Sequence, residues 1–320
     1  MSEKEKKPVV HFLQYAFFQV FLRLIRLLPL GVATWVGKII GRTCAFLSPV
    51  LTPKMKHLAI EDMREAFTRI SRNDQGMTRQ EASVKVTELY KNLGMSIVEF
   101  ARIGTLTKER VNKVVSFEGI ENLRIATESG QAVIILSAHF GSWELLNAAL
   151  ALNGFPLHVV ARPLDNKYFD KFITAQRSAF GGGVIEREGA LRGMLKVLKN
   201  KEILGILLDQ RPPKKDAVMV DYFSRPAPTG KGLAAVAMKT HALVLPIFIV
   251  RDTTAGLEYQ HKIICEPPVE IANTGDKEAD LKENTRRFTF EIEKIVTKHP
   301  EQWLWFHSRW IKRRRKNGSL

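Results

Sequence analysis

A histidine and a glutamate, His139 and Glu144, stand where a buried strand is expected to pass into a helix. Residues 132–136 form a short apolar run rich in β-branched side chains, which is typical of a strand buried on both faces. Ser142 is a residue type that caps helices, and the apolar residues after it recur at helical spacing. We therefore expect His139 in the turn before the helix and Glu144 in the first helical turn.

The spacing decides whether these two side chains can act together. Inside one continuous helix, residues five positions apart are rotated by about 140° and do not meet. With His139 in the turn, the Glu144 carboxylate can fold back on the imidazole, and a negative charge is favourable at a helix start. A carboxylate-oriented imidazole at the carboxyl end of a strand would serve as general base for a hydroxyl. A loop histidine followed by a capping acid explains the same six residues.

Four polar residues follow other predicted strands, and these are Arg162, Arg187, Asp209 and Arg211. The carboxyl ends of parallel strands meet at one edge of a sheet, so we expect these residues close to His139. A guanidinium group is a planar donor that suits phosphates and carboxylates, which makes the arginines candidates for substrate binding. Surface ion pairs are the alternative. Asp209 is a further candidate for substrate binding, and the alternative for it is that it holds Arg211 in place.

The sequence HFGSWE at 139–144 resembles the H-x-x-x-x-E pattern of the lipid A secondary acyltransferases, which are lauroyl- and myristoyltransferases of the lysophospholipid acyltransferase superfamily. Glycerolipid members usually carry Asp where this chain has Glu144. Similar blocks follow in the family's order: GGGVIEREGALRGMLKVLK, GILLDQRPPKKDAVMVDYFSRPAPTGKGLAAVAMKTHALVLPIF and HPEQWLWFHSRWIKRRRK. The similarity runs over residues 10–316, and several ordered blocks are more specific than one short motif.

This resemblance implies an enzyme that moves a secondary fatty acyl chain from acyl carrier protein to a 3-hydroxyacyl hydroxyl of a Kdo-bearing lipid A precursor. It also implies that His139 is the base, that Glu144 orients it, and that Arg187 and Arg211 recognise substrate. Neither a G-x-S-x-G elbow nor a paired cysteine and histidine is evident, so we expect direct attack by the acceptor hydroxyl. A glycerolipid or mannoside acyltransferase of the same superfamily is the nearest alternative.

The composition adds a strong positive charge. The 320 residues suffice for one large α/β domain with an added helical segment. The formal net charge of +16 implies an anionic partner, such as a phospholipid surface, an acidic carrier protein, a phosphorylated substrate or nucleic acid. Since no RNP, zinc-finger or helix-turn-helix signature accompanies the charge, we expect no nucleic-acid partner. Cys44 and Cys265 lie far apart, and we expect no metal site and no cofactor.

The N-terminal stretch, residues 9–47, is apolar but contains Arg23, Arg26, Lys38 and Arg42. Its uncharged part, residues 8–22, is shorter than the roughly 20 residues that span a bilayer. We expect residues 1–50 to form a retained membrane-anchoring segment and residues 51–320 the catalytic domain, with a buried core helix as the alternative for the first. The basic residues after the apolar run predict that the catalytic domain lies on the cytoplasmic side. The resemblance implies that the membrane is the cell inner membrane.

The remaining pattern alternates strands and helices, which predicts an α/β fold with a mostly parallel sheet flanked by helices. Predicted strands are residues 114–117, 132–136, 157–161, 184–185, 203–208, 218–223, 243–250 and 262–265. Predicted helices are residues 54–70, 78–102, 121–129, 142–150, 166–180, 190–200, 231–240 and 281–298. Pro246 predicts an edge or irregular strand at 243–250, and the prolines at 226–230 predict a turn.

Near the C-terminus, Trp303, Trp305 and Trp310 alternate with basic residues and precede the basic run 312–316. Aromatic rings beside basic side chains suit a membrane interface, where the rings sit at headgroup level. They also suit nucleic acid, where rings stack on bases. The resemblance implies that part of the cluster packs in the core, because similar chains of the family carry it too.

Overall fold

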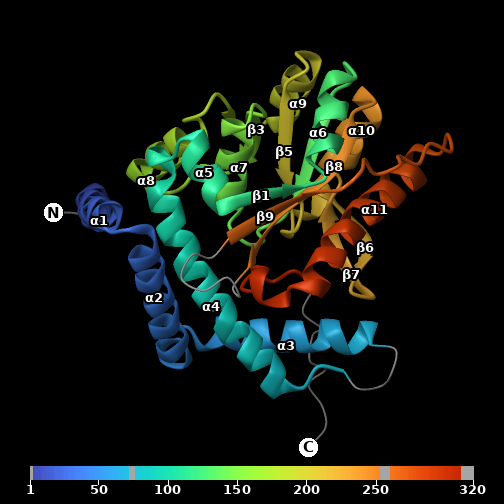
Figure 1. The fold of residues 1–320 in the computed structure, drawn as a ribbon. Helices are drawn as coiled ribbons and strands as arrows, with labels where there is room; N and C mark the ends of the chain where they lie inside the picture. Colours follow the sequence, from blue (N-terminus) through green and yellow to red (C-terminus); the bar gives the residue numbers. More distant parts are fainter. Residues whose placement is uncertain (1–2, 72–75, 253–259, 311–320) are drawn as a thin grey trace, which may run out of the picture.

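A seven-stranded sheet forms the centre of the molecule in the computed structural model, which describes residues 3–71, 76–252 and 260–310 (Figure 1). The strand order is β1-β9-β8-β2-β5-β3-β4. The bounds are β1 Val115–Glu118, β2 Val133–Ser137, β3 Leu157–Ala161, β4 Gly183–Glu186, β5 Ile203–Leu207, β8 Leu243–Asp252 and β9 Gln260–Cys265. The five strands from β8 to β4 pair in parallel, and β9 runs antiparallel to β8. The predicted mostly parallel sheet is confirmed.

Helices cover both faces of this sheet. Their bounds are α5 Lys108–Val114, α6 Ile120–Glu128, α7 Trp143–Leu152, α8 Lys167–Arg177, α9 Ala190–Lys199, α10 Gly232–Thr240 and α11 Lys277–Lys298. Alternate residues of β2 enter two separate apolar cores, with Ile134 and Leu136 in one and Val133 and Ile135 in the other. Because every residue of β2 is buried, its sequence is continuously apolar rather than alternating.

Strand β8 lies inside the sheet, so of the two alternatives predicted from Pro246, an edge strand or an irregular strand, the edge position is wrong. On one side, β8 pairs with β2 from Leu243 to Pro246. On the other side, it pairs with β9 from Ile247 to Asp252. The proline therefore stands where pairing changes from one neighbour to the other, while its carbonyl still accepts a hydrogen bond from the Glu266 N–H (3.0 Å). At this point a missing N–H interrupts neither ladder.

The predicted strand at 218–223 belongs to a separate antiparallel pair, β6 Ala217–Tyr222 and β7 Arg225–Gly230. The turn predicted at 226–230 is therefore wrong. Pro226 and Pro228 are two positions apart and face the same way, so both missing donors can fall on the free edge of a two-stranded ladder.

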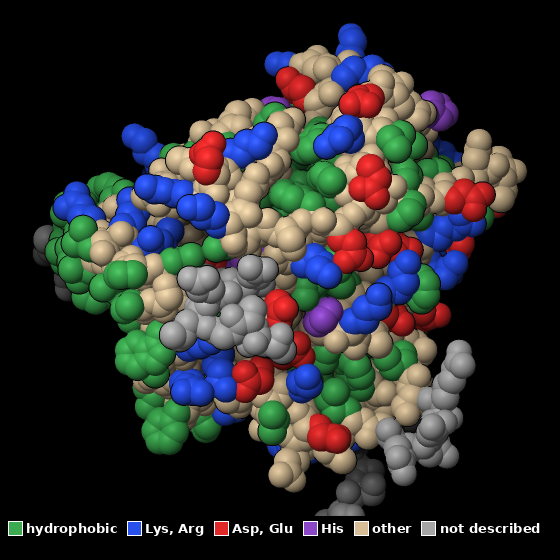
Figure 2. All heavy atoms as spheres, in the orientation of Figure 1, with side chains coloured by type: hydrophobic (Ala, Val, Ile, Leu, Met, Phe, Trp, Pro, Cys, Tyr) green, Lys and Arg blue, Asp and Glu red, His purple; other side chains and the backbone are tan. Residues whose placement is uncertain are grey.

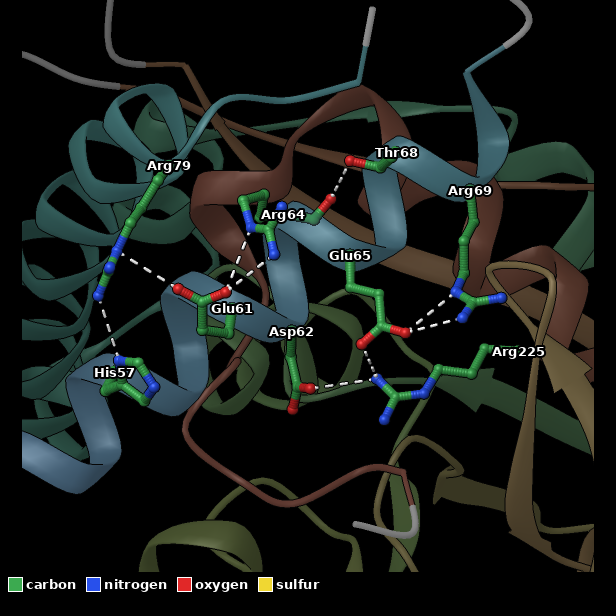
Figure 3. A network of polar contacts seen from close by, with 9 residues as sticks. All are labelled: His57, Glu61, Asp62, Arg64, Glu65, Thr68, Arg69, Arg79 and Arg225. Atoms are coloured by element: carbon green, nitrogen blue, oxygen red, sulfur yellow. Dashed lines mark hydrogen bonds and ion pairs between the residues drawn. The ribbon is translucent and has the colours of Figure 1, made fainter. Parts of the chain in front are cut away.

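Helix α3 (Pro53–Ile70) joins this β6–β7 hairpin to the rest of the molecule (Figure 3). Two of its carboxylates converge on the Arg225 guanidinium, Asp62 at 3.3 Å and Glu65 at 2.9 Å. Glu61, one turn away, pairs instead with Arg79 at the start of α4 (Arg79–Arg102). Neighbouring positions on one side of α3 thus hold the hairpin and α4.

The two N-terminal helices, α1 (Glu3–Leu27) and α2 (Leu30–Leu51), lie along one side of the molecule (Figure 1). Helix α2 packs so tightly on α4 that a Cβ added to Gly94 would lie 2.2 Å from the Gly37 carbonyl oxygen. By length and composition, the stretches Pro8–Leu27 and Leu30–Leu51 could each cross a membrane, which makes both helices candidate anchors. Figure 2 shows hydrophobic side chains over α1 and α2 on the left, with basic side chains among them.

The three C-terminal tryptophans are buried, with exposed fractions of 0% for Trp303, 1% for Trp305 and 3% for Trp310. They form one aromatic cluster with Tyr222 and Phe223 of the hairpin. The core interpretation of these residues is therefore confirmed, and their placement at a membrane interface or on nucleic acid is wrong. The basic run 312–316 lies outside the described residues.

Candidate active site

His139 and Asp209 occupy equivalent places after two neighbouring parallel strands. Strands β2 and β5 pair so that Ser137 is opposite Leu207, and each of the two residues follows its strand end by two positions. The ladder continues one step further, because the Leu208 N–H donates to the Ser137 carbonyl (3.1 Å). This arrangement brings the imidazole and the carboxylate together at the carboxyl edge of the sheet.

Asp209 accepts hydrogen bonds from three N–H groups, and its side chain is fully buried. Oδ1 accepts from Nδ1 of His139 at 2.8 Å. Oδ2 accepts from the His139 backbone N–H at 2.9 Å and from Nε1 of Trp303 at 2.8 Å. Since an ionised carboxylate is only an acceptor, Nδ1 carries the proton and Nε2 keeps its lone pair.

Opposing effects set the pKa values of this pair. Burial alone would lower the pKa of His139, but the charge and hydrogen bond of Asp209, helped by Glu144, outweigh it and raise that pKa above 6.5. Burial would likewise raise the pKa of Asp209, yet His139, His307 and Trp303 hold it well below its usual range. Asp209 therefore stays ionised, and the pKa of His139 lies above its ordinary value.

Glu144 lies in the first turn of α7, as predicted, but its carboxylate bonds to Arg177 at the end of α8. The Arg177 Nε–H lies 3.1 and 3.2 Å from the two carboxylate oxygens. The predicted hydrogen-bonding partner of the imidazole is therefore wrong, since Asp209 takes that place and does not pair with Arg211. Glu144 still acts on His139 through its charge, which Arg177 opposes. The catalytic roles of His139 and Glu144 stay predictions.

The turn at 139–142 is held tightly in place. Gly141 has φ +57°, and a Cβ there would lie 2.0 Å from the Ile249 carbonyl oxygen of β8, so glycine meets both requirements. Ser142 is the N-cap residue of α7, as predicted, although its side chain makes no capping hydrogen bond. The turn is fixed by contacts from elsewhere in the chain rather than by its own cap.

A buried ionic cluster borders this turn on the α4 side. Arg251 of β8 donates to Glu99 (2.7 Å) and to the Ser96 hydroxyl (3.1 Å), and that hydroxyl lies 3.4 Å from the Gly141 carbonyl. Burial would raise the pKa of Glu99, but the charges of Arg251 and His261 lower it to about 2. Glu99 is thus an ionised partner for Arg251 inside the protein.

Two of the predicted arginines line an open hollow of about 460 Å³. It lies near the pair formed by His139 and Asp209, which we call the dyad. Arg187 and Arg211 line the hollow together with Gln210, Pro212, Pro213, His307 and Ser308. Gln210 also reaches the imidazole, because its amide N–H donates to Nε2 of His139 at 3.3 Å. Arg162 is not part of this lining; its side chain is 75% exposed and lies 3.8 Å from Asp165. For Arg162 the surface ion pair predicted as the alternative is present.

Within residues 3–71, 76–252 and 260–310, no group of three or more His, Cys, Asp or Glu side chains could hold a metal ion. The constellation that the described residues do form is a carboxylate-backed histidine whose Nε2 accepts a hydrogen bond from Gln210, and Gln210 lines a hollow together with two arginines. That arrangement can remove a proton from a hydroxyl and hold an anionic group nearby.

The family model described as Bacterial lipid A biosynthesis acyltransferase matches residues 3–312. The chain belongs to this family. It is similar to a lipid A biosynthesis acyltransferase of Haemophilus influenzae (24% identity, covering 82% of this chain and 79% of the relative). It is also similar to the palmitoleoyltransferase of Escherichia coli (26%, covering 88% and 86%) and to the lauroyltransferase of the same organism (25%, covering 79% and 81%).

Three residues of the site escaped the sequence reasoning: Arg177, Gln210 and Trp303. Gln210 follows Asp209 directly, so its place after a strand could have marked it. Arg177 lies within a predicted helix, and Trp303 lies 94 positions from Asp209. For these two no local pattern points to the dyad, because only the tertiary fold brings them there.

Proposed function

We propose that this protein transfers a secondary fatty acyl chain from acyl carrier protein to a 3-hydroxyacyl hydroxyl of a Kdo-bearing lipid A precursor. The observation that carries the proposal is the dyad of His139 and Asp209, in which Nε2 of His139 lies 3.3 Å from the amide of Gln210, a residue that lines the hollow together with two arginines. Membership of the lipid A acyltransferase family supplies the class of acceptor. The dyad and the hollow supply the chemistry that such an acceptor needs.

The reaction begins when the acceptor hydroxyl replaces the Gln210 amide at Nε2 of His139. Nε2 takes the hydroxyl proton while the oxygen attacks the thioester carbonyl, so a C–O bond forms and a tetrahedral oxyanion appears. As the oxyanion collapses, the C–S bond breaks and the thiolate of the carrier leaves. That thiolate takes the proton from the His139 imidazolium, which restores the neutral base and balances the reaction.

The surrounding charges assist these steps. Asp209 stabilises the imidazolium and keeps the proton of the neutral ring on Nδ1. Glu144 adds a negative charge that favours the imidazolium, while Arg177 holds its carboxylate in place. The Gln210 amide, displaced from Nε2 but still at the same edge, is a donor within reach of the developing oxyanion.

The arginines of the hollow are proposed to bind anionic groups of the substrate. Arg187 and Arg211 are both exposed, and they approach the hollow from different strand ends. Phosphates of the lipid A precursor suit such guanidinium groups. Arg162, at the neighbouring strand end, is proposed to extend this surface after its weak contact with Asp165 gives way.

The remaining partners follow from charge and apolar surface. The net charge of +16 favours an acidic carrier protein as donor, through long-range attraction that salt weakens. We propose that residues 1–50 anchor the chain at the inner membrane through α1 and α2, with residues 51–320 as the catalytic domain on the cytoplasmic side. The apolar side chains exposed on both helices support this contact.

The test is turnover of carrier-protein thioesters and acyl-CoA with tetra-acylated lipid A, penta-acylated lipid A and a lysoglycerolipid as acceptors. His139→Ala should lower turnover by about 10² or more, the range for a lost general base, without unfolding the protein. His158→Ala is the matched control, because His158 is a partly exposed histidine in β3 that pairs with Glu202. Near-normal turnover in folded His139→Ala would contradict the assignment, and preference for the lysoglycerolipid would favour the glycerolipid alternative.

A further inference from the structure

We infer that Trp303 is a positioning residue, whose indole N–H holds Asp209 and thereby sets the orientation and proton affinity of His139. The inference rests on the proposed function, in which His139 is the base. It adds a member to the dyad that contacts neither substrate. The contacts that support it all come from one short part of the chain, Gln302–His307, which we call the C-terminal clamp.

The first contact fixes the carboxylate. Asp209 Oδ2 accepts from Nε1 of Trp303 at 2.8 Å and from the His139 backbone N–H at 2.9 Å. Two donors on one oxygen hold the carboxylate plane, and this leaves Oδ1 directed at Nδ1 of His139 (2.8 Å). Trp303 and Asp209 are both fully buried, so no water competes for these bonds.

The same clamp fixes the backbone of both dyad residues. The Leu304 N–H donates to the His139 carbonyl (3.0 Å), and the Gly141 N–H donates to the Gln302 carbonyl (2.8 Å). On the other side, Nε2–H of His307 donates to the Asp209 carbonyl (3.1 Å). Four residues of this clamp, Gln302, Trp303, Leu304 and His307, therefore hold the histidine turn, the aspartate backbone and the aspartate side chain together.

The indole N–H also affects the charge available to the imidazole. A donor on Oδ2 withdraws negative charge from the carboxylate and so weakens its attraction for the imidazolium. Besides Asp209, the charged or titratable groups that act on His139 are Glu144, Arg177 and His307. Removing the indole N–H leaves those three unchanged, so the pKa of His139 is expected to rise.

The chain offers a matched control in Trp305. This residue is equally buried and lies in the same aromatic cluster, with ring centroids 4.5 Å from those of Trp303. Its indole N–H donates to the Pro300 carbonyl (2.8 Å) and not to the dyad. Trp303→Phe and Trp305→Phe thus remove the same group and similar volume, and they differ in whether Asp209 loses a donor.

The experiment follows the ring nitrogens of His139 by NMR during a pH titration of the full-length protein in detergent, alongside the pH profile of kcat/KM. Trp303→Phe should move the titration midpoint of His139, and with it the acidic limb of the kcat/KM profile, to a pH higher by about 0.5–1 unit. It should also lower kcat roughly tenfold. Trp305→Phe should leave the midpoint in place and lower only the Tm. Equal midpoints in the two variants, with similar losses of Tm, would assign Trp303 to packing alone and overturn the inference.

A second measurement needs no substitution, which keeps the inference testable if Trp303→Phe does not fold. In the wild-type protein, the Trp303 indole N–H signal should shift with the same midpoint as His139, because both groups share Asp209. A signal that does not follow His139 would overturn the inference.

The result is separable from the proposed function. If His139→Ala keeps its turnover while Trp303→Phe still moves the His139 midpoint, the function falls and the positioning role stands. If His139→Ala is inactive and Trp303→Phe does not change the titration midpoint of His139, the proposed function stands and the positioning role of Trp303 falls.

Discussion

The two ends of the chain look alike in sequence but differ in the structure. Both combine aromatic and apolar side chains with basic ones. At the N-terminal end many of these side chains face outward from α1 and α2, and Trp35 is 56% exposed. Within residues 303–310 the three tryptophans and Arg309 are inside, and Trp305 is 1% exposed. Adjacent aromatic and basic residues therefore do not indicate a surface by themselves.

Polar partners across the fold explain the difference. Near the C-terminus, the indole N–H groups of Trp303 and Trp310 donate to Asp209 and to the Tyr222 carbonyl. Arg309 likewise bonds the Pro228 carbonyl at 2.6 Å. With such partners the polar atoms can be buried without a large penalty. The backbones of α1 and α2 satisfy their own polar groups as helices, and this leaves an apolar surface for which lipid is a suitable cover.

The largest expected effect tests this comparison with one tryptophan from each end. Trp310→Ala should lower the free energy of unfolding by about 3–5 kcal/mol, because it leaves a cavity in the aromatic core. Trp35→Ala should change it by about 0.5 kcal/mol or less in detergent. Chemical denaturation of both variants in the same detergent measures the difference. Similar losses would mean that α2 is as much a part of the core as the C-terminal end.

The next effect concerns the packing of helix α2 against helix α4. Gly94→Ala should destabilise the protein by about 1–3 kcal/mol, because the new methyl group would lie 2.2 Å from the Gly37 carbonyl and force α2 from α4. Gly232→Ala is the control, since a Cβ there meets nothing within 4 Å. Thermal unfolding of both variants reads out the effect. An unchanged Tm in Gly94→Ala would show that the two helices separate at little cost.

A smaller effect is expected from removing residues 1–28, which deletes α1 and its arginines. Binding to anionic vesicles should fall by about tenfold or more, because apolar area and positive charge are both lost. Activity on detergent-dispersed acceptor should remain, since no dyad residue lies in α1. Flotation of intact and truncated protein on anionic and neutral vesicles measures the two contributions. Equal flotation of the two proteins would place the membrane contact elsewhere.

The smallest effect is the pH dependence of kcat/KM that His139 produces. Because the pKa of His139 is raised, neutral base is lost as pH falls through a value above 6.5, and kcat/KM should fall up to about tenfold per unit below it. Glu144→Gln removes a charge that raises this pKa, so the acidic limb should move to lower pH. Glu202→Gln, near His158 in β3, serves as the control. A wild-type limb below pH 6.5 would contradict the charge arrangement.

Much of the fold could be predicted because it follows from local pattern. The apolar runs at 132–136, 157–161 and 203–208 became β2, β3 and β5 within a residue or two. Prolines caused the errors. Taken alone, a proline predicts a break in a strand. Here Pro246, Pro226 and Pro228 stand at positions of the sheet and the hairpin where the missing backbone N–H interrupts no strand pairing.

The site could be predicted only in part. His139, Asp209 and Glu144 were chosen from their places at strand ends and at a helix start, and the fold brings the first two together. Which carboxylate bonds to the imidazole depends on the pairing of β2 with β5 and on Arg177, 33 positions from Glu144. Spacing along the chain favours Glu144 as the partner of the imidazole. In the fold, Arg177 binds the Glu144 carboxylate, and the Asp209 carboxylate bonds to the histidine.

The close packing of α2 against α4 has an energetic consequence for a lipid acceptor. Gly94 contacts α2, and two residues further along α4 the Ser96 hydroxyl lies 3.4 Å from the Gly141 carbonyl in the histidine turn. With α2 in the bilayer surface as proposed, the reacting edge is about one helix diameter, roughly 10 Å, from the lipid. Pulling a twelve-carbon chain fully into water would cost roughly 10 kcal/mol at about 0.8 kcal/mol per methylene. A path this short lets the acceptor raise its headgroup and the first carbons of the reacting chain, while the rest of its chains stay in hydrocarbon.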